Sequence, residues 1–258
     1  MNKLILNFKS KNSKKIKNPK NFLGGKGANL SQMGRMGLPV PPGFTISTKV
    51  CDLFYKNKKK LPKNLMFSIK KELRLIEKNT KKKFGDLKNP LLVSVRSGAR
   101  VSMPGMMDTI LNLGLNDKTV QALLKKTSNS RFAKDSYRRF IQMYSTVVLG
   151  IESYHFEELI ENYKLTKGII LDTDLDSDDW DGLINDFKNV VKNKTKKEFP
   201  QDVYEQLNGA IKAVFLSWNS DRAKVYRKIN QIPDNWGTAV NVQAMVFGNM
   251  GNDCATGV

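Results

Sequence analysis

Two short segments of this chain carry residue types that bind phosphate groups. In the first, residues 91–117, an apolar run ends at Arg96 and a loop of Gly, Ser, Pro and Met follows. A fixed guanidinium beside free backbone N–H groups suits a polyphosphate tail. The N–H groups expected to contribute are those of Ser97, Gly98, Gly105 and Met106. Gly, Ser and Pro also form ordinary turns, so this loop alone leaves both interpretations open.

The second segment is a glycine-rich run, GGKG, at residues 24–27. Its glycines let the backbone approach a ligand closely, and Lys26 supplies a mobile positive charge. The run is not a Walker A loop, because Lys20 stands where the first Gly belongs and Gly27 replaces the Ser or Thr. By itself the run is a weak signal.

Three longer blocks, taken together, resemble one family. They read GGKGANLSQMGRMGLPVPPGFTIST, LLVSVRSGARVSMPGMMDTILNLGLND and NVQAMVFGNMGNDCATGV. In order and spacing they are similar to the amino-terminal part of the pyruvate, phosphate dikinase family, over residues 23–258. The related phosphoenolpyruvate synthases typically have acidic and small residues where this chain has SMPGMMDT. The dikinase family is therefore the closer match.

The resemblance implies an α/β (α+β) fold: the first half of an ATP-grasp nucleotide-binding domain, with a helical insert. In that family this domain transfers the β-phosphoryl group of ATP to a histidine on a separate swivelling domain, and the γ-phosphoryl group passes to inorganic phosphate. The phosphohistidine then phosphorylates pyruvate in a barrel-shaped domain. The implied reaction converts ATP, pyruvate and phosphate into AMP, phosphoenolpyruvate and diphosphate. The implied partners are ATP, these two domains and, in the full-length form, a second subunit.

The resemblance also assigns roles to individual residues. Lys26 and Arg96 would grip the ATP phosphates, with Arg96 as the catalytic cation, since cations stabilise the charge that develops during phosphoryl transfer. The other phosphate contacts implied are Gly105, Met106 and Met107 over the γ-phosphate, and Thr256 and Gly257 from the opposite side.

The chain departs from the family pattern in three places. Cys254 and Ala255 replace the usual Ser-Gly, and Ala255 adds a Cβ close to the expected phosphate contact. Arg100 adds a charge that either assists phosphate binding or points to solvent, and we expect the second. Family members continue beyond Val258, so the ligands of Mg²⁺ and the two further domains are expected downstream, with no metal site in this chain. We therefore expect an incomplete fragment that is inactive alone; the alternative is a non-catalytic remnant or one chain of a split phosphotransferase.

The single histidine, His155, tests whether the chain carries the phosphohistidine step. It lies in a segment with apolar residues at helical spacing and Glu on the other face, which is typical of a structural or surface residue. We therefore expect no phosphoryl-accepting histidine in this sequence.

Composition excludes several other classes of protein. The chain has 258 residues, 40% of them hydrophobic, and a net charge of +20. Its lysine runs lack interleaved aromatic residues, which disfavours nucleic acid as the main partner. The two cysteines are far apart and have no metal-ligand spacing. Without a long apolar run or a signal peptide, we expect a cytoplasmic protein that does not enter a membrane.

The hydrophobic pattern divides the chain into three parts. Residues 1–117 with 200–247 form the expected first grasp subdomain, 118–199 a helical insert with its own small bundle, and 248–258 the start of a second subdomain. Strands are predicted at 4–8, 44–47, 91–95 and 239–247, and helices at 28–36, 49–56 after a Thr48 cap, 65–78 and 205–228.

An acidic stretch at 172–181 superficially resembles a calcium loop. The EF-hand pattern needs Gly at 177 and Glu at 183, where this chain has Ser177 and Leu183. A helix start, with Asp176 as the N-cap, explains the stretch better.

Overall fold

A single antiparallel sheet organises the part of the chain that the computed structural model describes, residues 4–251 and 253–255. Its strand order is β1-β2-β7-β5-β6, so β7 lies in the middle. The strands are β1 (Ile5–Asn7), β2 (Gly43–Ile46), β5 (Val93–Ala99), β6 (Thr109–Leu113) and β7 (Thr238–Ala244). A separate parallel pair joins β3 (Lys83–Phe84) to β4 (Pro90–Leu91).

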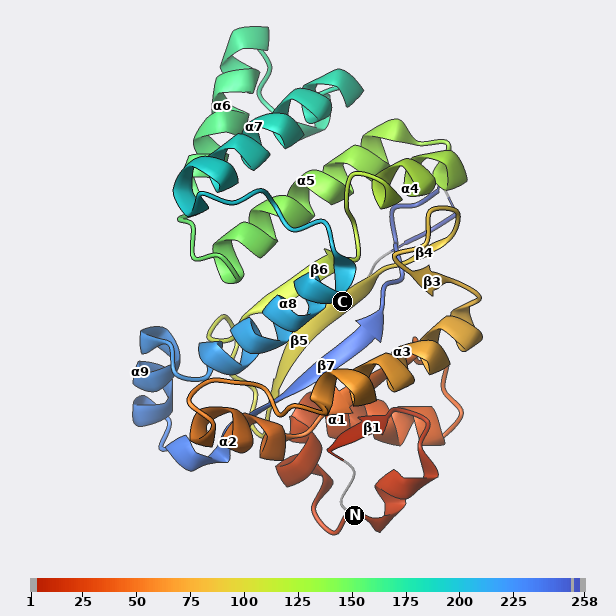
Figure 1. The fold of residues 1–258 in the computed structure, drawn as a ribbon, viewed down its shortest axis with the longest axis vertical. Helices are drawn as coiled ribbons and strands as arrows, with labels where there is room; N and C mark the ends of the chain where they lie inside the picture. Colours follow the sequence, from red (N-terminus) through yellow and green to blue (C-terminus); the bar gives the residue numbers. More distant parts are fainter. Residues whose placement is uncertain (1–3, 252, 256–258) are drawn as a thin grey trace.

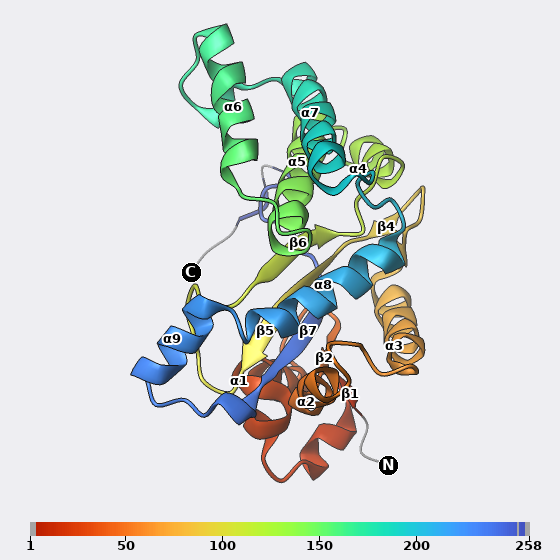
Figure 2. The same ribbon diagram turned by 60° about the vertical axis from the view of Figure 1, so that its left-hand side comes forward.

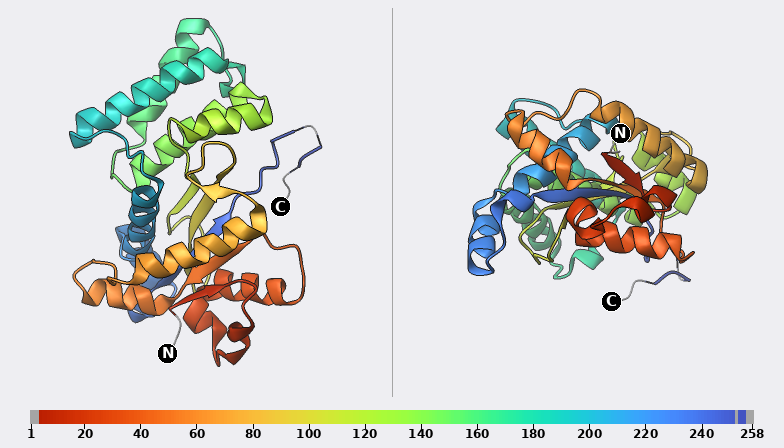
Figure 3. Two further views of the ribbon diagram at one scale, coloured as in Figure 1. Left: turned by 45° about the vertical axis from the view of Figure 1, so that its right-hand side comes forward. Right: turned by 90° about the horizontal axis from the view of Figure 1, so that it is seen from below.

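Helices cover both faces of this sheet (Figure 3). One face carries α1 (Pro19–Arg35), and the other carries α2 (Thr48–Lys56), α3 (Leu65–Thr80) and α8 (Val203–Ser217). On the second face the sheet presents an apolar row made of Phe44, Val242, Val95 and Ile110, which are neighbours in register. All four are fully buried, so this face forms the centre of the core.

The helical region stands at one end of the sheet, away from α1 (Figures 1 and 2). It comprises α4 (Thr119–Thr127), α5 (Ser130–Val147), α6 (Tyr154–Lys167) and α7 (Ser177–Thr195). Its apolar core is continuous with that of the sheet, and Phe140 and Tyr144 pack on Phe199 with ring centroids 5.8 and 5.6 Å apart. The three-part division of the chain stays a prediction.

Short elements complete the path: η1 (Lys11–Lys15), η2 (Asp172–Asp174), α9 (Asp221–Ile229) and η3 (Asp234–Trp236). No helix in the described residues is both long and apolar enough to span a bilayer.

Several predicted elements are confirmed. The helix predicted from residue 65 is α3, and its apolar stripe of Leu65, Ile69, Leu73 and Ile76 is buried. Asp176 caps α7: its carboxylate accepts from the N–H groups of Asp178 and Asp179, and the Asp179 side chain accepts from the Asp176 N–H in return.

Other predicted boundaries are wrong. The helix predicted at 28–36 begins at Pro19, a residue suited to the first helical turn. The single helix predicted at 205–228 is two helices, because Ser220 caps α9 by accepting from the Ala223 N–H. Ser47, not Thr48, occupies the N-cap of α2, and the Thr48 hydroxyl donates to the Asn21 carbonyl at 2.7 Å.

Candidate functional site

Lys26 sits where helix α1 bends. The glycine-rich run lies inside α1 and not in a loop before it, which corrects the expected start of this helix. Gly24 has φ +69°, outside the helical region, so two helical segments meet there. A Cβ on Gly24 would lie 1.6 Å from the Gly98 carbonyl oxygen. Only glycine therefore allows the bend to press against β5, and Gly25 opens the second segment, the kind of helix start that favours anions.

Arg96 lies within β5, which continues to Ala99. It stands opposite Asn241 in β7 and Thr109 in β6. The expected phosphate contact of the Gly98 N–H is wrong, because that N–H donates to Thr238 Oγ1 at 3.2 Å. Ser97 also lies inside the strand, in register with Val240. The loop that sequence placed after Arg96 therefore starts later, at Arg100.

The structure brings Lys26 and Arg96 together on the α1 side of the sheet. Partial burial lowers the pKa of Lys26, and the positive charge of nearby Arg96 lowers it further. The ion pairs formed within the described residues include neither side chain. The Arg96 Nε is buried without a hydrogen-bond partner. Two neighbouring cations without an acidic partner form a site that an anion would stabilise.

The loop between β5 and β6 is anchored at its base. Met103 is buried in a small cluster with Trp218 and Ala223. The Asp108 carboxylate accepts from the Arg222 guanidinium, and the Asp108 N–H donates to Ser217 Oγ at 3.4 Å. Burial raises the pKa of Asp108, while Arg222 opposes that shift. These contacts hold both ends of the loop against α8 and α9.

The tip of this loop is less constrained. Gly105 has φ +71° and nothing within 4 Å of the position a Cβ would take. The Met106 N–H donates to the Met103 carbonyl at 3.1 Å, so this predicted phosphate contact is engaged within the turn. Met106 and Met107 pack against the Met103 cluster. Closure of Gly105, Met106 and Met107 over a γ-phosphate stays a prediction.

Arg100 does not point to solvent as expected. Its guanidinium lies over the Trp236 ring, 5.0 Å from the centroid, and burial lowers its pKa. The Arg100 carbonyl lies 3.3 Å from where a Cβ on Gly25 would stand. The start of the loop thus contacts the bend of α1.

The predicted contacts of Thr256 and Gly257 lie outside the described residues. Nearby, the Cys254 N–H donates to the Gly251 carbonyl at 3.1 Å. No group of three His, Cys, Asp or Glu side chains in the described residues is placed to hold a metal ion.

Sequence reasoning missed five residues around this site: Thr45, Asp108, Arg222, Trp236 and Asn241. The partners in each contact are more than 100 residues apart in the chain, so no local pattern links them.

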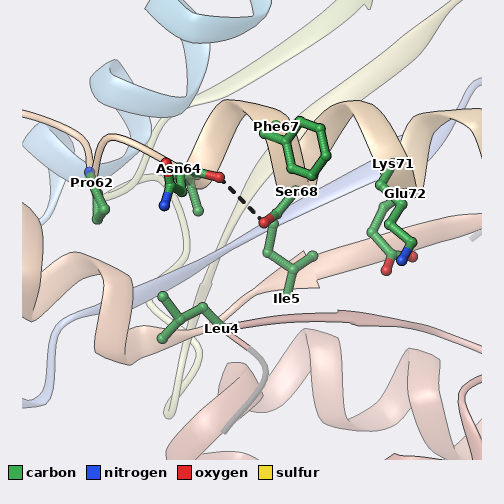
Figure 4. A pocket seen from close by; sticks show the side chains of 9 residues that line it. Leu4, Ile5, Pro62, Asn64, Phe67, Ser68, Lys71 and Glu72 are labelled. Atoms are coloured by element: carbon green, nitrogen blue, oxygen red, sulfur yellow. Dashed lines mark hydrogen bonds between the residues drawn. The ribbon is translucent and has the colours of Figure 1, made fainter. Parts of the chain in front are cut away.

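Another hollow in the described structure lies between β1 and α3 (Figure 4). Its volume is about 350 Å³, and its lining includes Leu4, Ile5, Pro62 and Phe67. Neither Lys26 nor Arg96 lines it, and apolar side chains make up most of its surface. Its lining also includes the polar side chains of Asn64, Ser68, Lys71 and Glu72, and neither glycine-rich segment contributes to it.

Comparison with known proteins finds one matching family and several similar relatives of this chain. The family described as "Pyruvate phosphate dikinase, AMP/ATP-binding domain" matches residues 20–67 and 57–258. The pyruvate, phosphate dikinase of Clostridium symbiosum is 55% identical over 240 residues, which cover 93% of this chain and 28% of the relative. The chloroplastic enzyme of Flaveria pringlei is 52% identical over 99% of the chain, and that of Rickettsia felis 50% identical over all of it.

The chain thus spans little more than a quarter of the length of these relatives. Both segments that carry Lys26 and Arg96 fall within the matched residues. The mixed α/β architecture, with an antiparallel sheet between helices, is that of an ATP-grasp-type nucleotide-binding domain. The chain belongs to the family of pyruvate phosphate dikinase AMP/ATP-binding domains.

Proposed function

We propose that this chain binds ATP by its polyphosphate tail, with Lys26 and Arg96 as the phosphate grip. The observation that carries the proposal is the closeness of these two cations without an acidic partner in the described residues. Phosphate oxygens accept readily from guanidinium and ammonium groups. Burial and, second, the charge of Arg96 lower the pKa of Lys26, and a bound anion would offset both effects.

In this proposal Arg96 is the catalytic cation. Arg96 projects from β5, an inner strand of the sheet, and its Nε is buried, whereas Lys26 follows the bend of α1. Fixed positive charge stabilises the negative charge that spreads over a phosphoryl group in transfer. The loop at Gly105, Met106 and Met107 would close over the γ-phosphate with the N–H groups of Gly105 and Met107 as donors, since the Met106 N–H is engaged in the turn. Thr256 and Gly257 would approach the phosphates from the opposite side.

We further infer that ATP binding serves the full dikinase reaction, with a phosphohistidine domain and a pyruvate-binding domain as partners and a homodimer as the assembly. The names and similarity of the relatives support the reaction, and the two domains and the homodimer are what the family resemblance implies. ATP usually carries Mg²⁺. The described residues do not fit a resident metal site, and no step above depends on one.

The same inference places the protein in the cytoplasm, although the Flaveria relative is named as chloroplastic. A net charge of +20 supports attraction of a polyanionic nucleotide.

The test is calorimetric titration of the chain with ATP and with inorganic tripolyphosphate. We expect Lys26→Met and Arg96→Met each to weaken both ligands about tenfold or more, since each removes a charge-assisted contact. Lys20→Met, on the same helix but before the bend, is the matched control and should bind normally. Unchanged affinity in both test variants would overturn the proposal.

A further inference from the structure

A row of polar side chains crosses the sheet beneath α1. Thr45 stands opposite Asn241, Asn241 opposite Arg96, and Arg96 opposite Thr109, across four neighbouring strands. Side chains directly opposite one another on adjacent strands share a face and lie close together. Arg96 is therefore the direct neighbour of Asn241.

Two members of this row form a buried bond. The Thr45 hydroxyl donates to Asn241 Oδ1 at 2.8 Å, and both side chains are 1% exposed. This bond fixes the amide plane and directs the Nδ2 group away from Thr45, toward β5. The Asn241 Nδ2 is buried and has no hydrogen-bond partner, like the neighbouring Arg96 Nε. Buried polar groups usually find partners, so two unpaired donors side by side call for an explanation.

Helix α1 packs against Thr45 and Asn241 beside two glycines, one in α1 and one in β5. A Cβ on Gly27 would lie 2.6 Å from Thr45 Oγ1 and 3.0 Å from Asn241 Oδ1. A Cβ on Gly98 would lie 2.6 Å from Asn241 Nδ2 and 3.6 Å from the Leu23 carbonyl of α1. The Asn241 amide thus lies between the bend of α1 and strand β5, directly below the turn that carries Lys26.

We propose that Asn241, held by Thr45, is the positioning residue of the cation pair: it sets how α1 sits on the sheet, and so the distance between Lys26 and Arg96. The importance of that distance for ATP rests on the proposed function. The packing of α1 on Thr45 and Asn241, called the seating of α1 below, does not depend on it.

The unpaired amide explains why an asparagine occupies a core position. An apolar residue of similar size would fill the space without the bond to Thr45 that fixes its orientation. An aspartate would place a carboxylate beside Arg96 and compete with phosphate for both cations. The neutral amide, with its donor side toward the site, leaves both cations available to an anion.

The test compares Asn241→Leu and Thr45→Val with the control Ser94→Ala in the same 258-residue chain. Ser94 is a buried residue of β5 on the same face as Arg96, and it is not one of the residues on which the bend of α1 packs. The first readout is the pKa of Lys26 without nucleotide, measured by the pH dependence of its acetylation by acetic anhydride and mass spectrometry. The second is the dissociation constant for ATP, also measured in the Lys26→Met background.

Both test variants should raise the pKa of Lys26 toward its ordinary value, because a loosened contact between α1 and the sheet lets the amine reach water and move away from Arg96. ATP affinity should fall about tenfold, equivalent to 1.4 kcal/mol, and this loss should vanish in the Lys26→Met background. Thr45→Val keeps the shape of the side chain, so it tests the seating even where Asn241→Leu folds poorly.

A Lys26 pKa unchanged in both variants would overturn the seating role, even if their thermal stability falls. So would losses of ATP affinity that simply add to that of Lys26→Met. If instead the pKa shifts as expected but Lys26→Met and Arg96→Met bind ATP normally, the seating stands and the proposed function fails.

Discussion

Gly24 is the residue on which the bend of α1 most directly depends. Gly24→Ala meets two penalties at once. Its φ of +69° and ψ of 171° lie in a region essentially confined to glycine, at a cost of ~1–3 kcal/mol for alanine. The new Cβ would also lie 1.6 Å from the Gly98 backbone oxygen, which no rotamer can avoid, so α1 must move off β5. Forced repacking of this kind typically costs ~1–3 kcal/mol.

The free energy of unfolding should therefore fall by about 4 kcal/mol, which lowers the melting temperature of a chain of this size by roughly 8–16 °C. Gly37→Ala is the matched control, because Gly37 has φ +84° and nothing within 4 Å of a new Cβ. It should suffer only the backbone penalty of ~1–2 kcal/mol. Differential scanning calorimetry and urea unfolding would measure both. Equal destabilisation by the two variants would refute the close contact between the bend and β5.

Three further predictions concern other parts of the chain. The N–H of Asp179, with Lys167 and the N–H of Asp178, lowers the pKa of Asp176 from 3.8 to about 2, so stability from this carboxylate is present above pH 4 and lost as pH falls toward 2. Asp176→Asn keeps a cap acceptor that does not titrate, so its free energy of unfolding should fall less than that of the wild type between pH 4 and pH 2. Urea unfolding at each pH would measure this, and equal falls in the two proteins would contradict it. Burial raises the pKa of Cys51 to about 11 while Cys254 is exposed, so a maleimide at pH 7.5 should label Cys254 rapidly and Cys51 only after unfolding. Fast labelling of both thiols would show that Cys51 is accessible. Finally, the purified chain should form no phosphoenolpyruvate from ATP, phosphate and pyruvate, because its single histidine, His155, lies in α6 beside Tyr154, remote from α1 (Figure 1). Detectable phosphoenolpyruvate in a coupled assay would contradict this.

Much of the local structure could be predicted from the sequence. The stripe of Leu65, Ile69, Leu73 and Ile76 marks α3 because its period matches one helix face. The Asp176 cap follows from an acidic cluster before an apolar run. Both features depend on residues within a few positions of one another.

The remaining errors arise where distant contacts override local pattern. The glycines at 24 and 25 predict a loop, yet only Gly24 leaves the helical conformation, and two helical segments meet there because the bend packs against β5. Nothing near Thr45 in the sequence points to Asn241, 196 residues away. Their pairing is a consequence of strand order and register, which a single sequence does not contain.

Cations beside glycine-rich segments suit phosphate, so the sequence alone predicts Lys26 and Arg96 as phosphate contacts. That they lie together is a result of the fold: α1 crosses the face of β5 on which Arg96 projects. The contacts of Arg100 with Trp236 and of Asp108 with Arg222 depend on the positions of α9 and η3, which follow the helices α4 to α8 in the sequence.

The most direct test of the phosphate grip follows the acetylation of each lysine in the presence and absence of ATP. Saturating ATP should slow acetylation of Lys26 strongly and leave Lys20, earlier on the same helix, unchanged. Tripolyphosphate should give the same protection, and adenosine none. Equal acetylation of Lys26 with and without bound ATP would contradict the assignment of this site.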